Sequence, residues 1–342
     1  VNTARCLRFR HQVTITRRCA KVKNKTAKSE HSMISNIFYF LKIIYKISPV
    51  FVIGELLWGI LEILPSRLIS VIGIKYIIDV LDLWPESFKM VINIPLISNI
   101  LFYPMKKSAD YIYSSADKII AVSDTYVNRA MKVNKKVDKG LSVYIGTDLK
   151  YFDECKKNNI VKFNDNLIRI AYIGTLGHSY DIKSIIDAIK LLNNRGINNI
   201  KFIVMGSGPL QNKFESYAKE KSIDCEFTGN LEYPKMVGLL CSCDIAVNPI
   251  VGKSVASIIN KVGDYAASGL PVINTQNSDE YRELLDKYNA GLNCENGNIE
   301  DIANKLEQLI SDKKLRDKLG KGNRKFAEEK FDRERTYKEI IE

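Results

Sequence analysis

The second half of the chain alternates short apolar runs with longer stretches in which apolar residues recur every three or four positions. The apolar runs cover residues 168–173, 201–205, 225–228, 244–247, 271–274 and 290–294. Strands buried on both faces of a parallel sheet have such continuous apolar runs, and the stretches between them have the spacing of helices. The pattern therefore predicts βαβ units and an α/β fold with a parallel sheet.

The first half is less regular but similar in kind. It predicts strands over 11–16, 50–53, 75–81, 118–123 and 141–145, and helices over 35–45 and 56–70. The polar segment 150–166 is typical of a linker. Since 342 residues are too many for one ordinary core, we expect two α/β domains, residues 1–150 and 151–330.

The excess positive charge lies in the first half. Residues 1–150 contain 23 Lys and Arg against 11 Asp and Glu, and the remaining residues contain 28 of each kind. This asymmetry indicates an anionic partner for the first half, such as a membrane surface or a pyrophosphate-linked lipid. The sequence contains no nucleic-acid-binding motif, so nucleic acid is not expected as a partner.

Cysteine and histidine usage argues against a metal site. Seven scattered cysteines are typical of reduced thiols in a cytoplasmic protein, and three histidines cannot form a His-rich centre.

No secretory signal is visible. The charge-free stretch 90–105 contains two prolines and is not expected to span a membrane; it lies on a membrane or packs under a loop.

Small residues follow three predicted strands of the second half. They are Gly174, Thr175 and Gly177, then Gly206 and Gly208, then Gly229. Ligands of open parallel sheets bind at the carboxyl ends of the strands, and glycine turns let backbone N–H groups approach an anion there. Each turn alone is common in α/β proteins, but three at one sheet edge favour a phosphate site.

The segment Asn260 to Val272 predicts an amphipathic helix, a glycine stop and a buried strand. Lys261 and Asp264 are three residues apart and share a helix face. A cation and a carboxylate at this spacing could hold a phosphate and a ribose diol, with Asn260 beside them; the alternative is a solvated salt pair. The pattern suits a nucleoside diphosphate.

In the first half, Asp82 and Glu86 follow the predicted strand 75–81, with Trp84 between them. Carboxylates past a strand end are candidates for acid–base chemistry. A helix-capping carboxylate and a packed tryptophan are the structural alternative.

Eight motifs in this order resemble a family 4 retaining glycosyltransferase of the GT-B fold, of the bacterial capsule, exopolysaccharide or O-antigen type. The motifs are Asp82–Ser87, Ala116–Ser123, Tyr144–Asp148, Tyr172–Gly174, Met205–Leu210, Phe227–Gly229, Cys243–Ile245 and Asn260–Val272.

The resemblance implies two Rossmann-like domains whose parallel sheets face a cleft. The first domain would bind a lipid-linked or glycan acceptor, the second a nucleotide-sugar donor, and a terminal helix over 331–342 would cross back to the first. The sugar would be transferred with retention, without a metal or another cofactor, in cell-surface polysaccharide synthesis at the inner face of the plasma membrane. Asp82 or Glu86 would orient or deprotonate the acceptor.

The chain departs from the family pattern at three places. Members have two acids eight residues apart near the donor helix; the second falls on Asp264, but the first falls on Ala256. Gly174 is followed by Thr175 instead of a basic pair, so we expect Lys261 to supply the positive charge. The family's first strand and Gly-rich loop are absent, which indicates an N-terminally incomplete chain.

Two alternatives remain open at this point. The missing acid and loop favour a partner subunit. Such a subunit would bind nucleotide or a sister transferase but would not turn over a substrate. A GT-B-type sugar-nucleotide epimerase or phosphorylase is the other, although the segment Trp84–Ser87 and the basic first half argue against it.

Overall fold

The computed structural model describes residues 75–83, 86, 99, 102–252 and 258–341. All of them belong to one compact unit, residues 59–342. The elements predicted within residues 11–70, most of the charge-free stretch, and Ala256 lie outside the described residues.

The second half forms a six-stranded parallel sheet, as the sequence predicts. Its strands are β4 (Ile168–Ile173), β5 (Ile200–Met205), β6 (Cys225–Gly229), β7 (Ile245–Asn248), β8 (Val272–Asn274) and β9 (Gly291–Asn293). Their order across the sheet is β6-β5-β4-β7-β8-β9. From β4 the chain adds β5 and β6 on one side of the sheet. It then returns to the other side of β4 and adds β7, β8 and β9 there.

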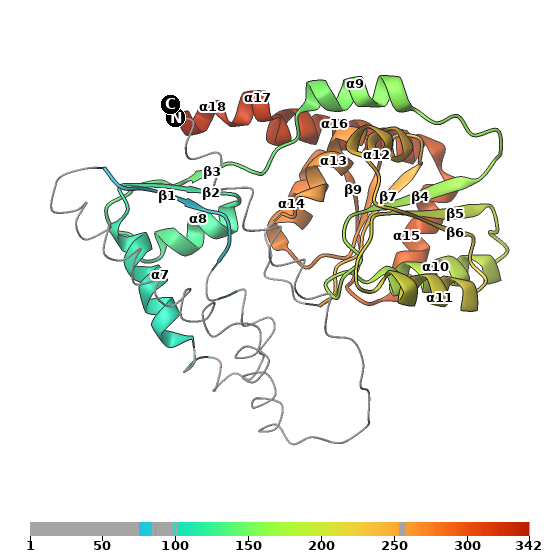
Figure 1. The fold of residues 1–342 in the computed structure, drawn as a ribbon, viewed down its shortest axis with the longest axis horizontal. Coiled ribbons are helices and arrows are strands. Elements are labelled where there is room, and N and C mark those ends of the chain that lie inside the picture. The colour runs from blue at the N-terminus through green and yellow to red at the C-terminus, as the bar shows by residue number, and fades with distance from the viewer. Residues whose placement is uncertain (1–74, 84–85, 87–98, 100–101, 253–257, 342) are drawn as a thin grey trace, which may run out of the picture. The chain divides into compact units, whose positions relative to one another are not determined.

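Helices cover both faces of this sheet (Figure 1). One face packs against α10 (Ile182–Asn194), α11 (Gln211–Glu220) and α15 (Ile299–Ser311). The other packs against α9 (Leu149–Asn159), α12 (Tyr233–Leu240), α13 (Lys261–Ser268), α14 (Asp279–Tyr288) and α16 (Lys313–Phe326). Successive strand residues point to opposite faces; Ile170 and Tyr172 belong to the first core and Ala171 and Ile173 to the second.

A smaller parallel sheet precedes this domain. It consists of β1 (Ile77–Val80), β2 (Lys118–Ala121) and β3 (Leu141–Ser142), in that order, with α7 (Tyr103–Ser115) and α8 (Asp124–Met131). Its buried cluster joins Ile78 and Ile119 from the strands to Tyr113 and Tyr126 from the helices. The strands are shorter than predicted, but each lies within its predicted segment.

The predicted linker 150–166 is wrong over most of its length, because α9 occupies residues 149–159. Its polar composition reflects one solvated face. The opposite face buries Leu149, Phe152 and Cys155, and α9 approaches α12 so closely that a Cβ on Gly238 would lie 2.0 Å from the Asn159 carbonyl oxygen.

The C-terminal segment comprises the π-helical turn η2 (Ala327–Phe331) and the short helices α17 (Arg333–Thr336) and α18 (Lys338–Ile341). The Thr147 amide donates to the Phe331 carbonyl at 2.7 Å, so this segment pairs with the chain just before α9. The domain boundaries predicted from the sequence stay predictions. The return of the terminal segment to the first domain also stays a prediction. Among the described helices none is both long and apolar enough to cross a bilayer.

Candidate functional site

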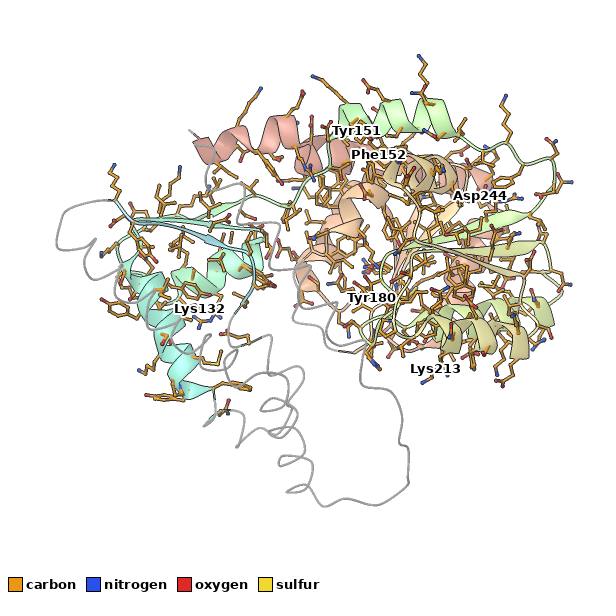
Figure 2. The ribbon with its side chains drawn as sticks, in the orientation of Figure 1. Lys132, Tyr151, Phe152, Tyr180, Lys213 and Asp244 are labelled. Atoms are coloured by element: carbon orange, nitrogen blue, oxygen red, sulfur yellow. The ribbon has the colours of Figure 1, made fainter. Side chains whose placement is uncertain are left out.

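The three glycine turns lie side by side at the carboxyl edge of the six-stranded sheet. The Gly174 amide donates to the Met205 carbonyl, and the Gly206 amide donates to the Gly229 carbonyl, each at 2.9 Å. Figure 2 shows Tyr180, which follows β4, and Asp244, which precedes β7, at opposite ends of the sheet. The turn after β4 lies where the strand order reverses between β4 and β7, which is where α/β sheets bind ligands.

Two of the predicted glycines are required by close backbone approach. Gly206 has φ +140°, and a Cβ there would lie 2.0 Å from the Gly174 carbonyl oxygen. A Cβ on Gly208 would lie 2.4 Å from the Leu176 carbonyl oxygen. These residues shape the turns; among the described residues, no acceptor takes a hydrogen bond from the amides of Thr175 or Gly177.

Lys261 begins α13 and extends to the turn after β4. Its Nζ atom is buried and has no hydrogen-bond partner among the described residues. It lies 4.1 Å from the Tyr172 ring centroid and 3.8 Å from that of Tyr180. A Cβ on Gly174 would be 2.9 Å from Nζ, so the amine lies against the Gly174 backbone.

The electrostatic state of this amine follows from its enclosure. Burial lowers the pKa of Lys261 well below its usual range. A charged amine without a counter-ion is costly inside a protein, and an anion arriving at Gly174 would remove that cost. Negative charge placed next to this amine would therefore favour its protonated form.

Asp264 lies one turn further along α13 and makes different contacts. Its Oδ1 atom accepts hydrogen bonds from the Tyr233 hydroxyl at 2.9 Å and the Thr147 hydroxyl at 3.1 Å. Burial raises the pKa of this carboxyl. Asp264 and Lys261 form no ion pair in the described part of the chain, so the alternative of a solvated salt pair is wrong.

Asn260 caps the N-terminus of α13 without a side-chain hydrogen bond to the helix, and it is exposed. Its side chain is thus not used by the helix itself. Of the predicted donor-binding residues, the structure brings Gly174, Gly206, Gly229 and Lys261 together directly.

Asp82 and Glu86 differ in their surroundings. Asp82 lies just past β1 and its residue is exposed. Partial desolvation of its carboxyl raises the pKa of that group. Glu86 accepts a hydrogen bond from Arg129 Nε at 2.5 Å, while Arg129 Nη2 donates to Asp110 at 2.7 Å. The second carboxylate oxygen of Glu86 is buried and has no partner among the described residues.

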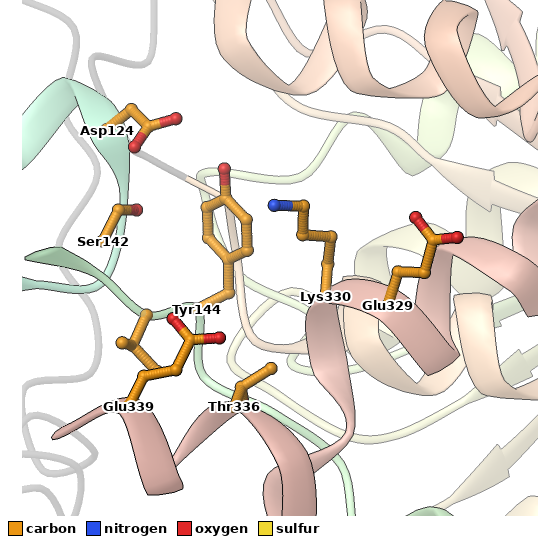
Figure 3. A pocket seen from close by; sticks show the side chains of 8 residues that line it. Asp124, Ser142, Tyr144, Glu329, Lys330, Thr336 and Glu339 are labelled. Atoms are coloured by element: carbon orange, nitrogen blue, oxygen red, sulfur yellow. The ribbon is translucent and has the colours of Figure 1, made fainter. Parts of the chain in front are cut away.

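A separate small pocket lies between β3, η2 and the terminal helices. Figure 3 shows the Lys330 side chain extending toward Tyr144 inside it, with Asp124 and Glu339 also among its lining residues. Its volume of about 70 Å³ admits a few water molecules but not a nucleotide sugar. It contains none of the predicted site residues.

Sequence reasoning missed Tyr172, Tyr180, Tyr233 and Thr147. Tyr172 lies in a predicted strand and would be assigned to the core on its pattern alone. Tyr180 and Thr147 lie in connecting segments, and only the tertiary fold brings them to α13. Thr147 and Tyr172 lie within two of the eight motifs, Tyr144–Asp148 and Tyr172–Gly174, and this was the sequence signal available for them.

Comparisons with known proteins agree with this architecture. The sequence profile of the family described as "Glycosyl transferases group 1" matches residues 153–326, about half of the chain. An uncharacterised glycosyltransferase of Methanocaldococcus jannaschii is 24% identical over 219 residues, which cover 64% of this chain and 56% of that protein. The capsular polysaccharide biosynthesis glycosyltransferase CapM of Staphylococcus aureus is 26% identical over 250 residues, which cover 70% of this chain and 63% of CapM. The chain thus spans less than two thirds of these relatives.

Solved structures share the fold. HepE of Anabaena, in complex with UDP, superposes with a TM-score of 0.62 at 14% identity, over 83% of this chain and 75% of that chain. A TarM mutant of Staphylococcus aureus was solved in complex with fondaparinux, α-GlcNAc-glycerol and UDP. It superposes with a TM-score of 0.53 at 18% identity, over 69% of this chain and 46% of that chain. The chain has the α/β architecture with parallel sheets of the GT-B glycosyltransferases.

Proposed function

We propose that this chain, which belongs to the group 1 glycosyltransferases, binds a nucleotide-sugar donor at the turn after β4 and transfers the sugar to a glycan acceptor. The observation that carries the proposal is the buried Lys261 amine, which lies against Gly174 without a hydrogen-bond partner among the described residues. This place suits the donor diphosphate. UDP is the first donor nucleotide to test, since HepE and TarM were both solved with UDP.

The chemistry of the site would be electrostatic. Lys261 and the amides of Thr175 and Gly177 would stabilise the negative charge that develops on the departing diphosphate. No metal is needed in this scheme, because the protein supplies the positive charge itself. Asp264 would accept hydrogen bonds from the ribose hydroxyls in place of those it accepts from Tyr233 and Thr147.

The acceptor side of the proposal rests on the first half of the chain. Asp82 or Glu86 would orient the acceptor hydroxyl or take its proton. The similarity to CapM, a capsular polysaccharide biosynthesis glycosyltransferase, supports a role in surface polysaccharide synthesis. The basic first half supports a lipid-linked acceptor at an anionic membrane surface. Transfer would proceed with retention at the anomeric carbon.

Variants of the two carboxylates test the acceptor side. Wild-type turnover in both Asp82→Asn and Glu86→Gln would exclude a role of Asp82 or Glu86 in orienting or deprotonating the acceptor.

A calorimetric experiment tests the donor site. We expect Lys261→Ala to weaken the binding of both UDP and inorganic pyrophosphate by about 10- to 100-fold, since a charge-assisted hydrogen bond is lost. Asp264→Ala should weaken UDP binding but leave pyrophosphate binding unchanged. Lys313→Ala is the matched control, because Lys313 is exposed and pairs with Asp317 at 3.0 Å on α16. Undiminished UDP binding by Lys261→Ala would falsify the proposal.

A turnover experiment separates the function classes. The protein is incubated with UDP-sugars and a polyprenyl-diphosphate-linked sugar, and UDP release and the anomeric configuration of the product are measured. Release that requires the acceptor identifies a transferase. Interconversion of the donor sugar without acceptor identifies an epimerase, and binding without release identifies a partner subunit.

A further inference from the structure

Two tyrosine rings, those of Tyr172 and Tyr180, flank the Lys261 amine. The Tyr172 and Tyr180 rings meet edge to face, with their centroids 5.8 Å apart, and Nζ lies within about 4 Å of both centroids. Cation–π attraction acts at up to about 6 Å, so both rings contact the amine at favourable distances.

Both rings are fixed by the backbone around them. Tyr172 lies in β4, and its hydroxyl donates to the Thr175 carbonyl at 2.8 Å. The Tyr180 amide donates to the Gly177 carbonyl at 3.3 Å, and the neighbouring Asp181 amide donates to the Pro249 carbonyl at 3.2 Å. The Tyr180 hydroxyl itself makes no hydrogen bond to the described residues, so its aromatic ring is the part that acts on Lys261.

An aromatic contact positions a cation without neutralising it. A carboxylate in the place of Tyr180 would form an ion pair with Lys261 and compete with an incoming phosphate. The ring faces attract an ammonium group more weakly than a carboxylate would, so the amine can take up a proton and pair with a phosphate when one arrives. They also exclude water, which strengthens a later contact between the amine and a phosphate.

Resting on the proposed function, we propose that Tyr180 is a positioning residue of the donor site, whose ring, with that of Tyr172, holds the Lys261 amine against Gly174 for the donor diphosphate. Because both rings are anchored to the sheet and its adjoining turns, they remain in place when the diphosphate binds. A long lysine side chain without them would have to be ordered by the ligand itself, at the expense of affinity.

The test compares variants at Tyr180 by calorimetry with UDP. Tyr180→Phe retains the ring and should bind UDP within about twofold of the wild type. Tyr180→Leu removes the ring and should raise the dissociation constant about 5- to 30-fold, the factor that corresponds to a contact of this strength. Thermal unfolding of both variants shows that they are folded.

A double-mutant cycle shows whether Tyr180 acts through Lys261. In the Lys261→Ala background, Tyr180→Leu should change UDP affinity by less than about twofold. Full additivity of the two substitutions, or unchanged or tighter UDP binding by Tyr180→Leu, would overturn the inference. If Lys261→Ala leaves UDP binding intact, the proposed function fails. If Lys261→Ala weakens UDP binding but Tyr180→Leu leaves it intact, this inference alone fails.

Discussion

Lys261 illustrates, at the scale of one residue, a conflict between stability and binding. Its buried amine has no partner among the described residues, so folding removes it from water without compensation. We expect Lys261→Met, which fills the same space, to be more stable than the wild type by about 1–3 kcal/mol at pH 7. Unfolding in urea measures the difference. Saturating UDP should reduce or reverse this difference, because the wild type binds UDP more tightly and gains more stability from it.

The sign of the pH dependence provides a second check on this substitution. Burial lowers the pKa of folded Lys261, so the unfolded chain binds more protons and wild-type stability rises with pH toward the unfolded value of 10.5. The advantage of Lys261→Met should therefore shrink between pH 7 and 9.5. Lys313→Met, at an exposed position, should show no such trend. A gap that widens with pH contradicts the assignment.

The sequence predicted that Lys261 and Asp264 share a helix, but not what surrounds them. Spacing along a helix is local, and the structure confirms that both lie on α13. The two partners of Asp264 are distant in the sequence: Tyr233 is 31 positions away and Thr147 is 117 positions away. Neither the aromatic rings around Lys261 nor the hydroxyls on Asp264 follow from local spacing, because the whole sheet must form before they meet.

At the scale of elements, α9 allows a direct test of helix against linker. Asp148 caps this helix by accepting a hydrogen bond from the Tyr151 amide at 3.0 Å, and Phe152 is fully buried against the sheet domain. We expect Asp148→Ala to cost about 1 kcal/mol and Phe152→Ala about 3–5 kcal/mol in urea unfolding. Asp148→Ser keeps a capping oxygen and should be nearly neutral. A flexible linker would tolerate all three substitutions.

The same helix shows why some elements were predictable and others were not. Strands β4, β5 and β7 are buried on both faces, so their continuous apolar runs identified them. Helix α9 buries one narrow face, with Leu149, Phe152 and Cys155 at intervals of three, and its lysines and asparagines suggested a linker. The Asp148 cap before this spacing was the available signal, and composition outweighed it.

At the scale of the whole molecule, Glu280 connects residues that are far apart in sequence. This carboxylate on α14 accepts hydrogen bonds from the Asp124 amide at 2.8 Å and the Thr125 amide at 2.9 Å, at the N-terminus of α8. The position favours negative charge, since the first amides of a helix have no partner within it. We expect Glu280→Ala to lower the free energy of unfolding by about 2 kcal/mol.

Hydrogen exchange gives the sharper measurement, because it reports on the two amides themselves. Glu280→Ala should speed the exchange of the Asp124 and Thr125 amides, while the amides in the middle of α8 keep their protection. Glu280→Gln retains acceptor capacity but no charge, and should fall between the wild type and the alanine variant. Glu283→Ala serves as the control, since Glu283 is exposed on the same helix. Equal exchange in the wild type and Glu280→Ala would show that the contact between α14 and α8 does not persist in solution, and that the two segments are coupled only through the chain that joins them.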